Sequence, residues 1–298
     1  MPIPFNRDFD VPYGELRRLS PMVSRLLARN PSPFTFRGTG VYFVGDDSAR
    51  DVAVIDPGPL VLEHLDALKR AVADKNVTHI LVTHTHSDHS PAAQPLKEWT
   101  GAKTYAFGPH GGGRDDEGGP KVEEGGDWSF VPDVAVRDND VIAGGGFTFD
   151  CVYTPGHTSN HMCYGLREEK ALFTGDHVMG WSTTVVAPPD GDMAQYMASL
   201  RKLLLRDDRV LYPTHGGPVN DPKPFLQAYI DHRLEREAQI LDCLREGVHT
   251  IPGIVARLYA DVDKRLHAPA ARSVLAHLIQ LEQEGRIEHH ADGYFPAA

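Results

Sequence analysis

The chain has 298 residues, a hydrophobic content of 41% and a formal net charge of −11, values that are ordinary for a globular protein with a substantial core. No apolar run is long enough to span a bilayer, and the N-terminus lacks the basic start, apolar stretch and cleavage site of a secretory signal, so we expect a cytoplasmic protein without membrane contacts. The acidic balance gives no long-range attraction for a polyanion, and three cysteines without a CxxC pair argue against a disulfide framework.

The first part of the chain predicts a mixed α/β protein. The runs "GVYFVG" (40–45) and "DVAVIDPG" (51–58) are β-branched and end in glycine or Pro-Gly turns, which indicates adjacent strands. Apolar residues at helical spacing then predict a surface helix over 60–76, followed by a buried strand, "VTHILVT". A second helix is expected over 90–100. Residues 84–89 therefore follow the carboxyl end of a strand, a frequent position for a functional site.

The middle of the chain alternates strand and turn signals. Residues 108–126 are rich in glycine and charge, and we expect a loop there, between strands and over a site. "KALFTGDHVMG" (170–180) predicts a strand that ends in Gly-Asp. A helix is expected over 192–208, and "VLYPTHGGP" (210–218) predicts a strand that runs into a glycine-rich turn.

The pattern changes near residue 221, where we place the boundary between a catalytic domain (1–220) and a C-terminal domain (221–298). Residues 225–247 predict one long amphipathic helix with Glu235, Arg236 and Glu237 on its polar side. The tail predicts helices and then a β-hairpin whose turn is Ala291-Asp292-Gly293. Helices followed by a short hairpin indicate a winged-helix module.

Seven histidine and aspartate side chains stand where a metal site would need them. Four are crowded into "THTHSDH", and three more follow apolar, strand-like runs beside a glycine. They are His84, His86, Asp88, His89, His157, Asp176 and His215. Five His and two Asp provide enough donors for two ions that share one carboxylate, whereas the alternative is a histidine-rich surface that arose by chance.

The chemistry of this donor set favours a hydrolytic metal centre. If His84-Thr85-His86 is extended, both imidazoles point the same way, and Asp88 and His89 can face a second ion. Nitrogen and oxygen donors without thiolate suit two Zn²⁺, and they also tolerate iron or manganese. Two ions roughly 3.5–4 Å apart can share a hydroxide, because a bound metal lowers the pKa of water to about 7.

The ordered motifs "THTHSDH", "TPGHT", "TGD" and "PTHG" resemble the metallo-β-lactamase superfamily. The resemblance implies a four-layer αββα sandwich with the site at one edge of two sheets. It also implies that His84, His86 and His157 hold one metal ion and that Asp88, His89 and His215 hold the other. Asp176 would then bridge the two ions, and Asp88 is also the expected catalytic carboxylate.

A narrower resemblance, to the beta-lactamase-like protein 2 family, covers nearly the whole chain. It is carried by "FTGDHVMGWSTTVV", "YPTHGGPV", "HRLEREAQIL" and "LAHLIQLEQEGRI". It implies that the sandwich is joined to a winged-helix-like domain, and that some relatives cleave single-stranded RNA. One departure is visible: Gly40 and Val41 stand where such proteins often carry Asn-Thr, so the polar support of those side chains is absent.

Other residues are candidates for the surroundings of the site. Asp56 matches an aspartate that supports the ligands in this superfamily, although hydrogen bonds within its Pro-Gly turn are an equal alternative. His161 has the spacing of a helical HxxxH pair with His157, but the ligand set is complete without it, so we expect a structural role. His177 is expected behind the ligands. Thr183 and Thr184 are candidates for the lining of the pocket.

Three functions remain open from the sequence. We favour a hydrolase of small acyl compounds such as an ester, thioester, lactone or β-lactam. The alternative is a metal-dependent endoribonuclease that cleaves single-stranded RNA. A winged helix that binds RNA would need a positive face, whereas residues 248–298 hold five Arg or Lys against six Asp or Glu. This domain is therefore expected to pack on the catalytic domain or on a second subunit in a homodimer. A regulator with a structural metal is the weakest hypothesis, because structural zinc sites are usually single ions with thiolates.

Overall fold

The computed structural model describes residues 2–46, 50–111, 125–261 and 263–297. Within these residues the strands form a seven-stranded sheet, a five-stranded sheet and a terminal two-stranded hairpin. The first sheet contains, in spatial and chain order, β1 (Leu16–Arg18), β2 (Val23–Leu27), β3 (Gly40–Val44), β4 (Asp51–Ile55), β5 (Asn76–Leu81), β6 (Lys103–Ala106) and β7 (Val134–Ala135). The second sheet, with the order β12-β11-β10-β9-β8, contains β8 (Val141–Gly144), β9 (Phe147–Tyr153), β10 (Met162–Leu166), β11 (Ala171–Gly175) and β12 (Val210–Pro213).

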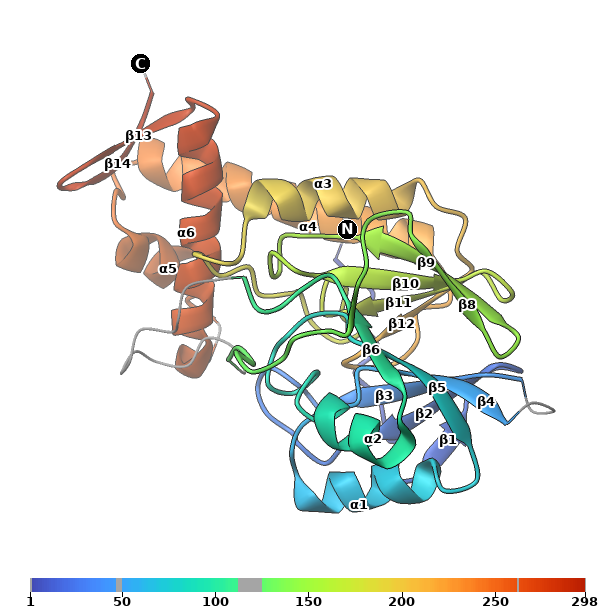
Figure 1. Ribbon diagram of the computed structural model, residues 1–298. Coiled ribbons are helices and arrows are strands. Elements are labelled where there is room, and N and C mark those ends of the chain that lie inside the picture. The colour runs from blue at the N-terminus through green and yellow to red at the C-terminus, as the bar shows by residue number, and fades with distance from the viewer. Residues whose placement is uncertain (1, 47–49, 112–124, 262, 298) are drawn as a thin grey trace.

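The two large sheets pack face to face between two pairs of helices (Figure 1). Their inner faces share one apolar core, in which Tyr42 of β3 meets Phe173 of β11 with ring centroids 5.1 Å apart. Helices α1 (Leu62–Ala71) and α2 (Ala93–Thr100) cover the outer face of the first sheet, and α3 (Met193–Leu204) covers that of the second. The fold is therefore the four-layer αββα sandwich that the sequence predicted.

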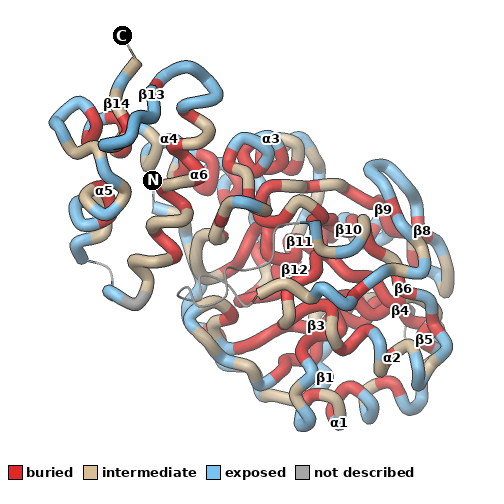
Figure 2. The backbone as a smooth tube through the Cα atoms, turned by 60° about the vertical axis from the view of Figure 1, so that its left-hand side comes forward, coloured by how far each residue is buried: buried red, intermediate tan, exposed pale blue. Residues whose placement is uncertain are grey.

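Burial follows this layering along the strands (Figure 2). Every residue of β2, β3, β10 and β11 is buried, because one face of each strand packs on the other sheet and the opposite face packs under helices or connecting segments. The adjacent strands predicted at 40–45 and 51–58 are confirmed as the antiparallel pair β3 and β4. The predicted buried strand at 77–83 is confirmed as β5, but it ends at Leu81 rather than at Thr83.

The sheets bring the ends of several strands to one edge of the sandwich. Strands β4 and β5 are parallel neighbours in one sheet, and β11 and β12 are parallel neighbours in the other. Parallel neighbours end at the same edge of a sheet, and a hydrogen bond of 2.9 Å from Gly40 N to Thr214 O joins the two sheets there. The segments that follow β4, β5, β11 and β12 therefore meet at this edge.

The C-terminal part consists of helices and a hairpin. Its elements are α4 (Pro222–Arg245), α5 (Ile251–Leu258), the 3₁₀ turn η1 (Lys264–Leu266), α6 (His267–Gln283), β13 (Ile287–His290) and β14 (Gly293–Pro296). They enclose an apolar core of their own, which includes Ile240, Ile254 and Leu278. The predicted long helix, later helices and terminal hairpin are confirmed.

The first half of α4 packs on the sandwich, and its second half packs in the C-terminal part. Phe225 and Tyr229 pack in the core beneath α3, whereas Ile240 and Leu244 pack in the C-terminal core. Helix α6 also contacts α3, and its Ala276 belongs to the same core as α3. The C-terminal part therefore packs on the sandwich of its own chain, and the boundary near residue 221 stays a prediction.

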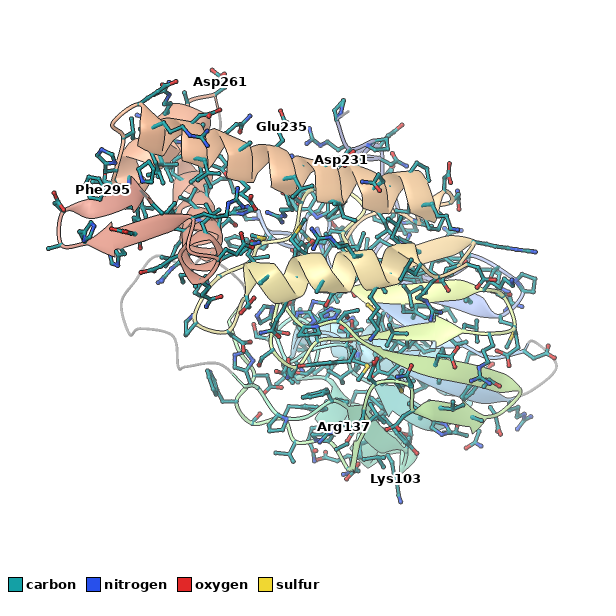
Figure 3. All side chains as sticks on the ribbon, turned by 90° about the horizontal axis from the view of Figure 1, so that it is seen from above. Lys103, Arg137, Asp231, Glu235, Asp261 and Phe295 are labelled. Atoms are coloured by element: carbon teal, nitrogen blue, oxygen red, sulfur yellow. The ribbon has the colours of Figure 1, made fainter. Side chains whose placement is uncertain are left out.

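The outer side of α4 carries acidic side chains, among them Asp231 and Glu235, which point away from α3 (Figure 3). The prediction that Arg236 lies with Glu235 on the polar side of this helix is wrong, because Arg236 is half-buried and faces a cavity. Of the glycine-rich loop predicted at 108–126, residues 112–124 lie outside the described part of the chain. No helix in the described ranges is long and apolar enough to cross a membrane.

Candidate metal centre

The structure brings all seven predicted donors together at the edge of the sandwich. Their donor atoms fall into three overlapping groups, and within each group the atoms lie within 4.8 Å of one another. All seven side chains are buried. The groups are His84, His86 and His157; His84, His89 and Asp176; and Asp88, His89 and His215.

His84, His86 and His157 form the first group. His86 Nδ1 lies 3.0 Å from His84 Nε2 and 3.3 Å from His157 Nε2, so three imidazole nitrogens converge on one point. The Thr85 side chain does not join this group, because its hydroxyl contacts His110 and Asn160. His157 Nδ1 donates a hydrogen bond of 2.7 Å to Val185 O, which directs its Nε2 toward His86.

The other two groups add the carboxylates of Asp88 and Asp176. His215 Nε2 lies 3.1 Å from Asp88 Oδ2 and 3.4 Å from Asp176 Oδ2, and His89 Nε2 lies 3.3 Å from Asp88 Oδ2 and 3.5 Å from Asp176 Oδ1. His215 Nδ1 donates to Gly38 O at 3.1 Å, which again directs Nε2 toward the carboxylates. Asp176 thus stands beside both His89 and His215.

Two observations show that these residues fit a metal ion. His89 Nε2 and Asp176 Oδ1 are buried without a hydrogen-bond partner among the described residues, although buried polar atoms are normally satisfied. The set also combines imidazoles with carboxylates, and a divalent cation binds the neutral imidazole and the ionised carboxylate. Burial, reinforced by His89, His86 and His157, holds the pKa of His84 well below its usual value and so favours the neutral ring.

The carboxylates require positive charge beside them. Burial alone would raise the pKa of Asp88, but His89 and His215 hold that pKa far below its usual range. Burial would lower the pKa of His215, yet Asp176 and Asp88 raise it to about 10. The two carboxylates therefore stabilise a cation at this position, and a metal ion bound by the same atoms would meet that demand.

Asp56 supports the donors from behind. Its Oδ2 accepts hydrogen bonds from His89 Nδ1 at 2.9 Å, from Thr83 Oγ1 at 2.8 Å and from Thr214 Oγ1 at 3.0 Å, and its Oδ1 accepts from Thr83 N at 2.8 Å. The backbone of Asp56 is left-handed, with φ of 49°, a conformation that aspartate and asparagine tolerate better than most residues. The carboxylate thus ties the loop after β5 to the loop after β12 and orients His89.

We expect Asp56→Asn to weaken metal binding by about 10- to 100-fold, because a carboxamide cannot accept all four hydrogen bonds and would no longer orient His89. Competition of the purified protein with a chromophoric chelator for Zn²⁺ measures this affinity. Asp74→Asn is the matched control, because Asp74 is 83% exposed and lies far from these contacts. Equal affinity of the two variants would contradict the supporting role of Asp56.

The other predicted neighbours take different positions. His177 is fully buried behind the donors, with its ring 4.6 Å from that of Tyr196, and it does not line the cavity described below. The residues from His157 to His161 form turns, so the helical geometry of an HxxxH pair is absent. His161 Nδ1 instead contacts Thr154 Oγ1 at 2.9 Å, and His161 is not part of the three donor groups.

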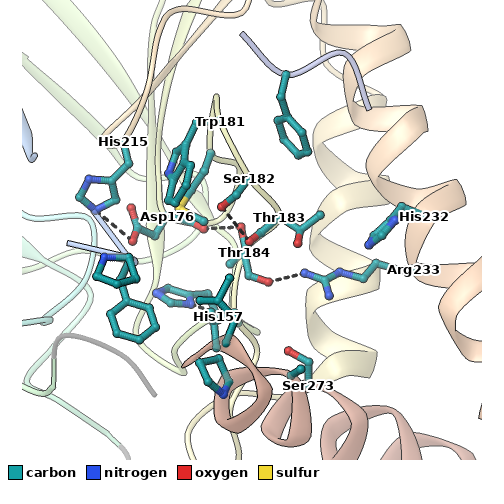
Figure 4. A pocket seen from close by; sticks show the side chains of 18 of the residues that line it. His157, Asp176, Trp181, Ser182, Thr183, Thr184, His215, His232, Arg233 and Ser273 are labelled. Atoms are coloured by element: carbon teal, nitrogen blue, oxygen red, sulfur yellow. Dashed lines mark hydrogen bonds and ion pairs between the residues drawn. The ribbon is translucent and has the colours of Figure 1, made fainter. Parts of the chain in front are cut away.

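A cavity of about 430 Å³ opens onto the donors (Figure 4). It is lined at one end by the donors His86, Asp88, His157, Asp176 and His215, and Thr183 and Thr184 both lie on its wall, as predicted. Thr184 Oγ1 donates a hydrogen bond of 2.7 Å to Asp176 O, so this wall is attached directly to a donor residue. The size suits a small organic molecule.

Most residues of the cavity wall were not predicted from the sequence. Aromatic side chains from three distant segments line it, namely Phe5, Phe34 and Trp181, and a basic group from α4 lines the side opposite the donors. The basic group has a recognisable pattern, because His232, Arg233 and Arg236 are spaced at i, i+1 and i+4 and so include neighbours on one helical face. The aromatic residues have no comparable signal.

Comparison with known families assigns both parts of the chain. Residues 34–215 match the family model described as the metallo-beta-lactamase superfamily. Residues 250–294 match the model described as the beta-lactamase associated winged helix domain. The second match covers α5, α6 and most of the terminal hairpin, in agreement with the predicted winged-helix module.

Relatives of known name match along most of the chain. A Caenorhabditis elegans protein named beta-lactamase-like protein 2 homolog is 32% identical over 282 residues, covering 92% of this chain and 88% of that protein. An Aspergillus fumigatus protein named atrochrysone carboxyl ACP thioesterase is 32% identical over 292 residues, covering 91% of this chain and 85% of that protein. A beta-lactamase domain protein from Burkholderia ambifaria has a similar structure, with a TM-score of 0.80 and 21% identity. The similarity covers 98% of this chain and 96% of that protein.

Proposed function

Because the chain belongs to the metallo-beta-lactamase superfamily, we propose that it is a hydrolase that binds two divalent metal ions, expected to be Zn²⁺, and cleaves small thioesters. His84, His86 and His157 would hold one ion, Asp88, His89 and His215 the other, and Asp176 both. The cavity that opens onto these donors carries the proposal, because it suits a small acyl compound.

A thioester fits this cavity better than the other acyl substrates that the sequence left open. The wall includes Phe5, Phe34, Met179, Trp181 and Val185, so it offers an apolar surface for an acyl chain. A thiolate is a weaker base than an alkoxide and leaves without prior protonation by a strong acid. Several relatives that match most of this chain are named ACP thioesterases, which supports the same class of substrate.

The chain's own residues would perform the following steps. Divalent ions held by the seven donors would supply water that is nucleophilic at neutral pH and would polarise the thioester carbonyl. The Asp88 carboxylate lines the cavity, accepts a hydrogen bond of 3.2 Å from Thr39 Oγ1 and would accept the proton of the attacking water. The aromatic wall would exclude other water from the acyl chain, and the loop at Thr183 and Thr184 would position the scissile bond.

RNA is the weaker candidate as a substrate. A polynucleotide needs an open, basic track, whereas this cavity is small and the C-terminal part shows no excess of Arg and Lys over Asp and Glu. The C-terminal helices instead contribute side chains to the cavity, including Tyr259 and Ser273. We propose that this domain completes the substrate pocket.

A single assay series tests the proposed function. We expect protein of known zinc content to hydrolyse a hexanoyl thioester of N-acetylcysteamine with a kcat/KM at least about tenfold above that for a lactone or a chromogenic β-lactam, since only a good fit of acyl chain and leaving group raises this ratio. Single-stranded RNA should stay intact. Cleavage of RNA without hydrolysis of the thioester would overturn the proposal and favour the endoribonuclease.

A further inference from the structure

The wall of the cavity opposite the metal donors is basic, although the whole chain carries a formal charge of −11. Helix α4 places Arg233, Arg236 and His232 there, all three on the lining. Figure 4 shows Arg233 and His232 extending from α4 toward the cavity, with Ser273 of α6 beside them. Arg233 is only 4% exposed, so its charge is almost completely removed from bulk water.

The two guanidinium groups are incompletely satisfied. Arg233 Nη2 donates to Thr184 O, and its guanidinium lies 5.1 Å from the ring centre of Tyr196. Arg236 Nη1 donates to Leu258 O at 3.4 Å, and its guanidinium lies 4.4 Å from the ring centre of Tyr259. The Nε atoms of both arginines are buried without a hydrogen-bond partner in the described part of the chain.

Neither arginine forms a salt bridge with a carboxylate of the described residues, and both contact backbone carbonyls and aromatic rings there instead. The nearest acidic side chains along α4 are engaged elsewhere or point away: Glu237 pairs with Arg286, and Asp231 and Glu235 lie on the outer side of the helix (Figure 3). A buried charge without a counter-charge is costly and is normally paired. An anion from outside the chain would supply the missing counter-charge.

The neighbouring histidines do not change the net charge of this wall. Burial, together with Arg233 and Arg236, lowers the pKa of His232 to about 4 and that of His277 to about 3. Both imidazoles are therefore neutral at pH 7, and the positive charge of the wall comes from the two arginines. His232 also lines the cavity and can donate or accept a hydrogen bond there.

We propose that Arg233 and Arg236 bind an anionic group of the substrate, a carboxylate or a phosphate, while the scissile carbonyl lies at the metal donors. The inference rests on the proposed function and narrows it to thioesters that carry negative charge at a distance from the reacting bond. An arginine fork suits either anion, because it donates two parallel hydrogen bonds to a pair of oxygens.

The position of Arg233 also links this subsite to the reaction centre. Arg233 donates to Thr184 O, and Thr184 Oγ1 donates to Asp176 O, so one residue contacts both the anion-binding arginine and a metal donor. Binding of an anion at Arg233 would thus fix the loop that faces the scissile bond. Tyr259 and Ser273, from the C-terminal part, close the same wall.

Two pairs of substrates distinguish the possible sources of the anion. The glutaryl thioester of N-acetylcysteamine carries a carboxylate on the acyl side, and its terminal amide analogue is neutral and of the same size. The hexanoyl thioesters of phosphopantetheine and pantetheine differ only in a phosphate on the thiol side. We expect the wild-type enzyme to prefer the charged member of one pair.

Arg236→Gln should remove that preference. Hydrogen bonds to a charged group contribute enough that kcat/KM for the charged thioester should fall by about 10- to 100-fold, while the value for its neutral partner stays within about twofold. Arg245→Gln is the matched control, because Arg245 lies on the same helix but is 62% exposed. Arg233→Lys, which keeps the charge but loses the fork, should show a smaller loss, and its thermal unfolding would report any damage to the fold.

Binding separates this inference from the proposed function. Glutarate and phosphopantetheine, titrated calorimetrically into the zinc-loaded protein, should bind more weakly to Arg236→Gln by a similar factor even if no thioester is hydrolysed. If none of the four thioesters is hydrolysed but one ligand shows this loss, the thioesterase proposal fails and the anion subsite stands. If Arg236→Gln leaves both the substrate preference and the binding of both ligands unchanged, the subsite is refuted.

Discussion

Asp176→Ala is expected to lower kcat/KM by about three orders of magnitude or more, because a metal ion stabilises several kcal/mol of charge in the transition state and each 1.4 kcal/mol is about tenfold in rate. Asp176 stands between His89 and His215. Its Oδ1 lies 3.5 Å from His89 Nε2, and its Oδ2 lies 3.4 Å from His215 Nε2. Removing its carboxylate would separate the positions that two ions must share. Steady-state kinetics with the preferred thioester measure the loss.

The fold should survive this change. The Asp176 side chain contacts His89 and His215 at the edge of the sandwich and belongs to none of the apolar cores, so alanine removes two ion pairs but no core packing. Circular dichroism and thermal unfolding of the metal-free proteins should therefore be similar for the variant and the wild type. Asp231→Ala, on the exposed side of α4, is the control and should retain full activity. Full activity of Asp176→Ala would disprove the metal mechanism.

Much of the donor arrangement was predictable from the sequence. His84, His86, Asp88 and His89 are close in the chain, so local geometry alone brings them together. His157, Asp176 and His215 could be added because each follows an apolar run, and strands in the same fold end at a common edge. The structure brings the donor atoms of all seven residues into three groups, and their assignment to two ions stays a prediction.

The supporting contacts were less predictable. The sequence placed Asp56 in a Pro-Gly turn but left its partners open, since Thr83, His89 and Thr214 approach it only after both sheets have packed. His177 lies behind the donors as expected, but its contact with the ring of Tyr196, which follows from the turn after β11, was not predicted. Adjacent residues in a turn point in different directions, and that direction depends on backbone angles that composition does not specify.

The basic wall was not predicted at all. It could not be predicted because it forms only when the C-terminal part packs against α4. On an isolated amphipathic helix, Arg236 beside Glu235 and Glu237 is expected to be solvated, as the sequence indicated. Packing of α5 against α4, with α6 in the same apolar core, covers this side of the helix and turns it into the wall of a cavity. Which residues of α4 line the cavity is therefore decided by elements that begin after Thr250.

Removal of the metal is expected to abolish activity as completely as Asp176→Ala, because the bound ions are what would lower the pKa of the attacking water and polarise the carbonyl. Dialysis against a chelator should lower kcat/KM by at least about a thousandfold, corresponding to roughly 4 kcal/mol of lost stabilisation of the transition state. Added Zn²⁺ should restore activity. We expect the recovery to be complete at two equivalents of Zn²⁺ per chain. Two of the donor groups, His84 with His86 and His157, and Asp88 with His89 and His215, share no residue, so each could hold one ion.

His215→Ala distinguishes two ions from one. His215 belongs only to the group with Asp88 and His89, whereas His84, His86 and His157 form a separate set that this substitution leaves intact. The variant should therefore retain about one equivalent of zinc by elemental analysis while losing most of its activity. If wild-type protein is fully active with one equivalent, the second donor group acts without a metal. Its carboxylates would then be paired with a protonated His89 or His215, as the raised pKa of His215 allows.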